Sequence, residues 1–158
     1  MATSSKEQIL RELRSVHVDD VPLPDFQDQW ITYEDRVAQF SDVLSAVGGR
    51  AVRVRDERDI GGELEQIDAC RGAAKICSLV DGIERANVNP DEFDDPHQLE
   101  DVDLFIARGE FGVAENAAVW ITDAHTKHRV LYFLTQHLVL VLPADQIVDN
   151  MHQAYERL

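Results

Sequence analysis

Residues 102–122 read Val-Asp-Leu-Phe-Ile-Ala-Arg-Gly-Glu-Phe-Gly-Val-Ala-Glu-Asn-Ala-Ala-Val-Trp-Ile-Thr, and this stretch decides the expected fold. One apolar run covers 102–107 and a second covers 117–121, with a glycine-containing break at 108–112 and the polar pair Glu115-Asn116 between them. Short apolar runs bounded by glycines are typical of buried strands. Ligands of open α/β sheets usually bind where such strands end. The stretch therefore predicts two buried strands with a polar, ligand-facing rim.

The segments on either side of this stretch predict a mixed α/β domain. Apolar residues recur at helical spacing over 5–16 and 34–47, and again after Pro143, where a last helix is expected from Asp145 onward. A short helix is expected at 64–69. The further expected strands are 51–55, 73–80, 130–134 and 137–142. The resulting order of the first half, α-α-β-α-β, is typical of a parallel sheet with crossover helices.

The first 33 residues differ in character from the rest. Ser4 and Glu7 have the spacing of a capping box at the start of the first helix. The following segment, 17–33, contains two prolines and the rings of Phe26 and Trp30, through which we expect it to attach to the body. We therefore predict an N-terminal helix and irregular connector, 1–33, and a single α/β domain, 34–158. The apolar stripe of the first helix must pack on the body or on a second subunit, and a homodimer is expected because dimers are the commonest assembly.

The composition argues against several classes of partner. The chain of 158 residues has 30 acidic and 15 basic residues, a net charge of −15, which disfavours nucleic acid and anionic membranes as partners. No apolar run approaches the ~18 residues of a membrane span, and the polar N-terminus indicates a cytoplasmic protein. The spacing of Cys70 and Cys77 fits neither a redox pair nor a zinc knuckle, so two buried thiols are expected. Asp94, Asp95 and His97 fall in a polar surface loop, 86–101, and we expect no metal and no cofactor.

Four arginines form the densest basic cluster of this acidic chain. They are Arg50, Arg53, Arg55 and Arg58. Such charges can protect the edge of a strand from aggregation, or they can form an anion site. The residues leave both interpretations open.

The candidate site residues follow from the opening stretch, because phosphate-loop, dinucleotide, nucleophile-elbow and zinc-protease motifs are absent. Glu115 stands among apolar residues, so we expect a partly desolvated carboxylate with a raised pKa. It is the candidate catalytic residue, as a general base or nucleophile. It could equally orient a ligand, or cap the amides of residues 109–112.

Five further residues are candidates for ligand binding. They are Arg108, Gly109, Gly112, Asn116 and His137. The two glycines would let the main chain approach a ligand or form a nest for an anion, or they only permit a tight turn. His137 joins the site if its strand lies beside 117–121, and otherwise it is a structural residue.

Two runs resemble the LUD domain of the lactate-utilisation protein C (LutC/YkgG) family. They are Val113-Ala114-Glu115-Asn116-Ala117 and Phe133-Leu134-Thr135-Gln136-His137-Leu138-Val139-Leu140-Val141, followed by the helix from Asp145. Asn116-Ala117 replaces the Thr-Gly of the family motif, and Arg108-Gly109-Glu110 replaces its Gly-Ala-Asp. The resemblance implies a NagB/RpiA/CoA-transferase-like fold, which is a three-layer α/β/α sandwich with a mostly parallel sheet. It also implies a part in oxidising L-lactate to pyruvate beside iron–sulfur oxidoreductase subunits.

Two functions are therefore expected. The first is an auxiliary protein of lactate or related organic-acid utilisation that binds a small organic anion or a partner subunit near Glu115. The alternative is a small CoA-transferase-like or sugar-phosphate-acting enzyme that uses Glu115, because Ala114-Glu115-Asn116-Ala117 is similar to the Ser-Glu-Asn-Gly of CoA-transferases. A third possibility is a purely structural subunit whose exposed helix stripes serve assembly, so the residues leave open whether the protein is an enzyme.

Overall fold

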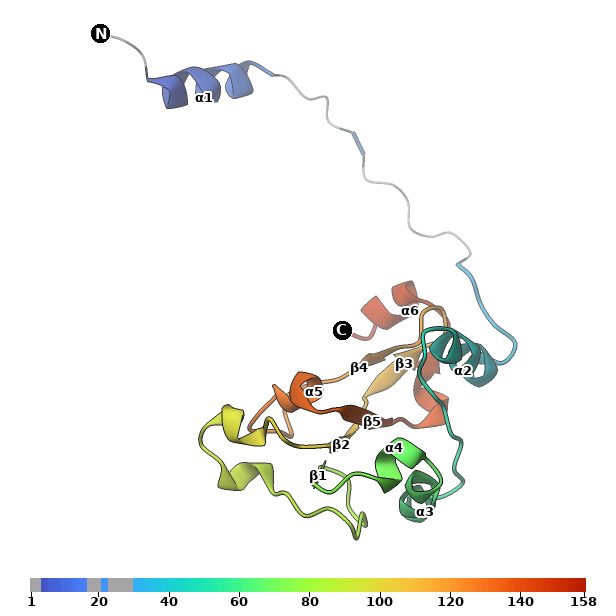
Figure 1. The fold of residues 1–158 in the computed structure, drawn as a ribbon. Helices are drawn as coiled ribbons and strands as arrows, with labels where there is room; N and C mark the ends of the chain where they lie inside the picture. Colours follow the sequence, from blue (N-terminus) through green and yellow to red (C-terminus); the bar gives the residue numbers. More distant parts are fainter. Residues whose placement is uncertain (1–3, 17–20, 23–29) are drawn as a thin grey trace.

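Two three-stranded sheets form the centre of the protein in the computed structural model, which describes residues 4–16, 21–22 and 30–158 (Figure 1). The first sheet has the order β1-β2-β5 and is entirely parallel. In the second, β3 pairs antiparallel with β4 and parallel with β6. The strands are β1 (Ile76–Ser78), β2 (Leu104–Arg108), β3 (Phe111–Val113), β4 (Ala118–Trp120), β5 (His137–Val141) and β6 (Ile147–Val148). The predicted α/β class with mostly parallel pairing is confirmed.

The first sheet is the middle of three layers, because its side chains alternate between two hydrophobic clusters. Leu104 and Ile106 of β2 pack with residues of α3 and α4 on one face. Phe105 and Ala107 pack on the other face with Leu99 and with Leu131 of α5. The helices are α1 (Ser5–Ser15), α2 (Arg36–Ala46), α3 (Ile60–Glu65), α4 (Asp68–Arg71), α5 (Leu131–Leu134) and α6 (Met151–Tyr155), and short 3₁₀ turns are η1 (Glu57–Asp59), η2 (Pro90–Glu92), η3 (Pro96–Leu99) and η4 (Ala144–Gln146).

The first two predicted helices are confirmed, and local chemistry explains their ends. The Ser4 hydroxyl accepts a hydrogen bond from the backbone N–H of Glu7, whose carboxylate accepts from the N–H of Ser4, so both halves of the capping box are present. Asp35 caps α2 through its side chain, which accepts hydrogen bonds from the N–H groups of residues 37 and 38. Gly48 ends α2 with a φ of +88°, a conformation that glycine adopts without steric cost.

Three predicted elements are wrong, and so is the expected burial of the strand at 117–121, because Ala118 and Trp120 of β4 are exposed. Residues 51–55 form no strand, because no neighbouring strand pairs with the segment. Val54 packs instead on the α3–α4 cluster. The apolar run at 130–134 is the helical turn α5, and apolar content alone cannot separate a short helix from a strand. In the last segment, Ile147 and Val148 form β6, and the helix begins only after Asn150, whose side chain accepts from the N–H of Gln153.

The chain at 30–33 attaches to the start of α6. The Trp30 ring stacks on His152 with 3.5 Å between ring centroids. The backbone N–H of Tyr33 donates to Asp149 Oδ1 over 2.9 Å, and Asn150 Nδ2 donates to the carbonyl of Ile31 over 2.8 Å. The predicted contact through Phe26 lies outside the described residues. Among those residues, no helix combines the length and apolar character needed to cross a membrane.

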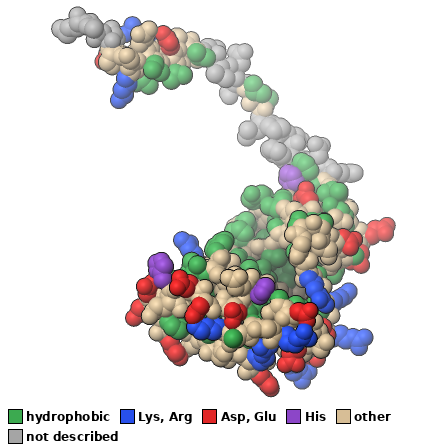
Figure 2. Space-filling model, viewed as in Figure 1, with side chains coloured by type: hydrophobic (Ala, Val, Ile, Leu, Met, Phe, Trp, Pro, Cys, Tyr) green, Lys and Arg blue, Asp and Glu red, His purple; other side chains and the backbone are tan. Residues whose placement is uncertain are grey.

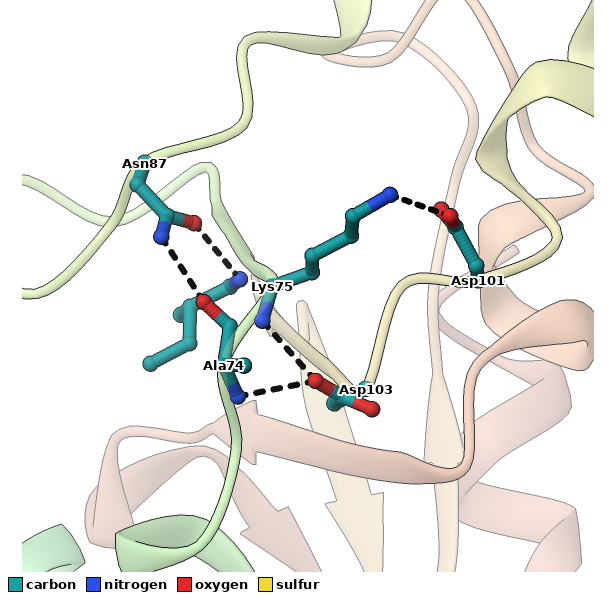
Figure 3. A network of polar contacts seen from close by, with 6 residues as sticks. Ala74, Lys75, Asn87, Asp101 and Asp103 are labelled. Carbon is teal, nitrogen blue, oxygen red and sulfur yellow. Dashed lines mark hydrogen bonds and ion pairs between the residues drawn. The ribbon is translucent and has the colours of Figure 1, made fainter.

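A polar network holds the starts of β1 and β2 together (Figure 3). One carboxylate oxygen of Asp103 accepts from the backbone N–H groups of Ala74 and Lys75, each over 2.8 Å. The side chain of Asn87 bridges the Ile76 N–H and the Ala74 carbonyl, and Lys75 pairs with Asp101. The hydrogen bonds from Lys75 and Ala74 hold the pKa of Asp103 below its ordinary value.

This network predicts a specific acid sensitivity. Because the pKa of Asp103 is lower in the folded than in the unfolded protein, its contribution to stability is present above the unfolded pKa near 3.8. That contribution is lost as the pH falls through the lower, folded value. We expect the melting temperature of wild type to fall more steeply below pH 4 than that of Asp103→Asn, measured by circular dichroism. Parallel acid profiles of the two proteins would contradict this role.

Candidate functional site

The structure separates the predicted site residues instead of gathering them. Arg108 ends β2 and pairs with Val141, whereas His137 begins β5 and pairs with Leu104, so Arg108 and His137 lie at opposite ends of the same pair of strands. Glu115 and its neighbour Asn116 lie on the turn from β3 to β4, in the other sheet. The strand of His137 does not pair with β4, so the condition for its joining the site is not met.

Glu115 is exposed, so the expected desolvation of its carboxylate is wrong. The turn extends beyond the end of β3, where the side chain reaches solvent. Glu115 Oε2 accepts a hydrogen bond from the backbone N–H of Met151 over 3.0 Å, and its own N–H donates to the carbonyl of Asp149. Glu115 therefore caps the first turn of α6, and not the amides of residues 109–112.

Asn116 and the two glycines shape the chain locally. Asn116 Oδ1 accepts from the N–H of Ala118 over 3.0 Å, and Ala117 has a φ of +55°, which closes the tight turn. Gly109 and Gly112 are buried against side chains: a Cβ on Gly109 would lie 2.4 Å from Val119 Cγ1, and one on Gly112 would lie 2.7 Å from Leu142 Cδ2. Close packing between sheet and side chains thus accounts for both glycines.

Arg108 forms a bidentate ion pair with Glu57 of η1. The Nη1–Oε1 and Nη2–Oε2 distances are 2.6 and 2.8 Å. The guanidinium lowers the pKa of Glu57, and the carboxylate raises the pKa of Arg108. Both side chains are about half exposed, so the pair serves chiefly to hold η1, and with it Arg58, beside the carboxyl end of β2.

A cavity of about 290 Å³ lies between α3, the loop that follows β1 and one face of the first sheet. Its floor is apolar and consists of Ile76, Leu104 and Ile106. Charged side chains of both signs, arginines and glutamates, stand on its walls. The remaining lining residues are Arg58, Gly61, Gly62, Leu64, Glu65, Cys70, Gly82, Ile83, Glu84 and Arg85. The volume is close to the lower end of the roughly 300–1,000 Å³ that small-molecule sites occupy.

The two arginines of the cavity are held differently. Arg58 is highly exposed and pairs with Asp56 over 2.7 Å, which lowers the pKa of that carboxyl. Arg85 donates to the carbonyls of Cys70, Arg71 and Ala73 at the end of α4, over 3.3, 3.1 and 2.8 Å. Within the described residues, no ion pair joins Arg85 to a carboxylate.

Positive charge continues around the cavity. Burial raises the pKa of the Cys70 thiol, and the charges of Arg85 and Arg50 oppose that rise. Within the described part of the chain, Arg50, Arg53 and Arg55 form no hydrogen bond or ion pair through their side chains. Figure 2 shows Lys and Arg side chains gathered over α3, α4 and the segment before them, with acidic groups among them. Because 51–55 is not a strand, protection of a strand edge does not explain this cluster.

Sequence reasoning missed the cavity residues Arg58 and Arg85 as a site. The signal for Arg58 was the arginine cluster, which the expected strand at 51–55 left ambiguous. Arg85 had no local signal, because it comes from a loop far from the cluster in sequence. Among the described residues, no group of three or more His, Cys, Asp or Glu side chains is placed to hold a metal ion. Cys70 and Cys77 are both buried and free, and burial raises the pKa of Cys77 to about 11.

Comparison with known proteins adds two findings. The LUD domain profile matches residues 80–158, a region that includes Arg85, Arg108 and Glu115 but not Arg58. A crystal structure of a DUF162 family protein from Deinococcus radiodurans is similar, with a TM-score of 0.61 and 17% sequence identity over 77% of this chain and 76% of that chain. At this identity the likeness supports the three-layer α/β/α fold alone. No curated protein matches the chain.

Proposed function

This chain belongs to the LUD domain family, and from this premise we propose its function. The protein acts in the utilisation of lactate or a related organic acid, as an auxiliary component that binds a small 2-hydroxy or 2-oxo acid. The cavity beside β1, with Arg58 and Arg85 on its lining, is the observation that carries this proposal.

The lining of the cavity matches the three parts of such a ligand. A guanidinium binds a carboxylate by charge-assisted hydrogen bonds, and the highly exposed Arg58 can exchange its pairing with Asp56 for the carboxylate of the ligand. Glu65 and Glu84 can accept a hydrogen bond from a hydroxyl group. The apolar floor accommodates a short alkyl group. L-lactate carries all three groups, and pyruvate carries the carboxylate and the methyl.

The site near Glu115 supports the proposal less well. Its carboxylate is exposed, and one oxygen is already used to cap α6. A nucleophilic Glu115, as in the CoA-transferase alternative, would form a thioester that hydroxylamine traps. Association with iron–sulfur oxidoreductase subunits is a further part of the proposal, and co-purification of such subunits with the tagged protein would test it.

A thermal-shift comparison tests the proposed ligand class. The panel contains L-lactate, pyruvate, acetyl-CoA, ribose 5-phosphate and chloride at matched ionic strength. A ligand at about 100 times its Kd raises the free energy of unfolding by about 2.7 kcal/mol, so selective stabilisation by L-lactate or pyruvate is expected.

Two variants locate the binding. Arg58→Gln removes a charge from the cavity, and its matched control Arg53→Gln removes a neighbouring exposed charge that does not line it. We expect Arg58→Gln to abolish most of the ligand-induced shift and Arg53→Gln to retain it. Equal responses from both variants, or a response to acetyl-CoA alone, would exclude the proposed site.

A further inference from the structure

A second, apolar groove of about 110 Å³ lies at the second sheet, between the β3–β4 hairpin and α6. Its lining is almost entirely hydrocarbon and aromatic: Phe111, Val113, Ala118, Val119, Trp120, Met151, Ala154, Tyr155 and Leu158. Trp120, Tyr155 and Leu158 are 43%, 69% and 62% exposed. Exposed apolar side chains gathered around a groove indicate an interaction surface more than scattered ones do.

Helix α1 has an apolar face that fits this type of groove. Ile9 and Leu13 stand four residues apart with Leu10 beside them, and their exposed fractions are 57%, 63% and 39%; Val16, just after the helix, is 63% exposed. No residue of α1 is buried, although its capping box is complete. Figure 2 shows hydrophobic side chains of α1 open to solvent, and Figure 1 shows the helix apart from β3, β4 and α6.

We propose that α1 of one copy docks in the β3–β4/α6 groove of a second copy, and that the exchange is reciprocal. The point of attachment supports this arrangement, because residues 30–33 are fixed to the start of α6, the helix that forms one wall of the groove. The 13 residues of 17–29 span at most about 45 Å when extended, which is enough to reach a neighbouring copy.

Symmetry and charge favour a second copy as the occupant. A reciprocal exchange satisfies both helices and both grooves and closes the assembly as a two-fold dimer. Helix α1 contains three basic and two acidic residues, so it is slightly positive, while the whole chain carries −15. The helix thereby adds no like-charge repulsion when it approaches the acidic body of its partner.

Analytical ultracentrifugation of the full chain tests the exchange. We expect wild type to sediment as a dimer, at twice 17.9 kDa, when the protein concentration reaches about 100 µM. Leu13→Glu in the helix and Leu158→Glu in the groove are both expected to weaken dimerisation by at least tenfold. Ser15→Glu introduces the same charge outside the apolar face of α1 and should leave the dimer intact.

Mixing the two weakened variants shows whether the helix and the groove bind each other. Leu13→Glu keeps an intact groove and Leu158→Glu keeps an intact helix, so the mixture regains association through one helix in one groove. A monomeric wild type would overturn the proposal, including the case in which α1 folds back on its own groove. A dimer that persists in both variants, or a mixture that stays monomeric, would overturn it as well.

Discussion

Replacing Phe105 with Ala is expected to lower the free energy of unfolding by about 3–5 kcal/mol, the largest effect that we predict for a single side chain. Phe105 is completely buried in the middle of β2, the central strand of the first sheet. Its ring packs edge-on against Tyr132, with 5.1 Å between centroids, and belongs to the cluster that includes Leu99 and Leu131. Truncation would leave a cavity between the first sheet and α5.

Phe133→Ala is the matched control, because the same chemical change is made one residue after Tyr132. The Phe133 side chain is 84% exposed, so its truncation should change the free energy of unfolding by less than about 0.5 kcal/mol. Urea denaturation of both variants gives the comparison. Similar losses in the two variants would mean that the 130–134 segment does not adopt the helical turn α5.

Gly112→Ala is expected to destabilise the protein by about 1–3 kcal/mol, because the site has no room for a methyl group. A Cβ at this position would lie 2.7 Å from Leu142 Cδ2, 3.2 Å from Phe40 Cε2 and 3.4 Å from Ile147 Cγ1. The Leu142 side chain would have to move and the Phe40 ring would have to give by a few tenths of an ångström, whereas the Ile147 distance is an ordinary contact. The loss is a matter of packing, so it should be independent of any added ligand.

Gly61→Ala provides the opposite case. Gly61 lies within α3, and a Cβ there would contact nothing within 4 Å. Alanine in a helix is favoured over glycine by roughly 0.5–1 kcal/mol, so this variant should be as stable as wild type or slightly more stable. Chemical denaturation without ligand measures both effects, and repeating it with L-lactate for Gly112→Ala tests the independence from ligand. A Gly112→Ala protein as stable as wild type would contradict the close packing of Leu142 and Phe40 against Gly112 of β3.

The elements that the sequence predicts well have their determinants close together along the chain. Ser4 and Glu7 cap α1, and Gly48 ends α2, so both helices could be placed from local chemistry. The strands β1 and β2 are apolar because both of their faces are covered, which is the usual pattern of parallel sheets, while β5 at the sheet edge is apolar but only partly buried. Their pairing order was not predictable, because it depends on contacts between residues far apart in the sequence.

The elements that failed depend on tertiary partners. Alternation at 51–55 indicates that Val54 faces the core, but a strand also needs a neighbour, and none pairs with this segment among the described residues. Ile147 and Val148 form a helical apolar spacing with Met151, yet pairing with β3 makes them a strand. Residues 102–121 contribute to two sheets because β3 begins within the glycine break, at Phe111.

The candidate site shows the same limit. The position of Arg108 at the end of β2 follows from the sequence, but its partner Glu57 does not. Glu115 stands among small apolar residues in the sequence, and only the geometry of the turn shows that its carboxylate reaches solvent. The cavity combines residues from η1, α3 and the loop after β1, so no single motif describes it.

Calorimetric titration of L-lactate into wild type, Arg58→Gln and Glu115→Gln tests the central claim most directly. Loss of one charge-assisted hydrogen bond costs about 1.5–3 kcal/mol, so we expect about 10- to 100-fold weaker binding by Arg58→Gln. Glu115→Gln should bind as wild type does. Unchanged binding by Arg58→Gln together with loss of binding in Glu115→Gln would contradict the arginine-lined cavity and place the ligand at the β3–β4 turn.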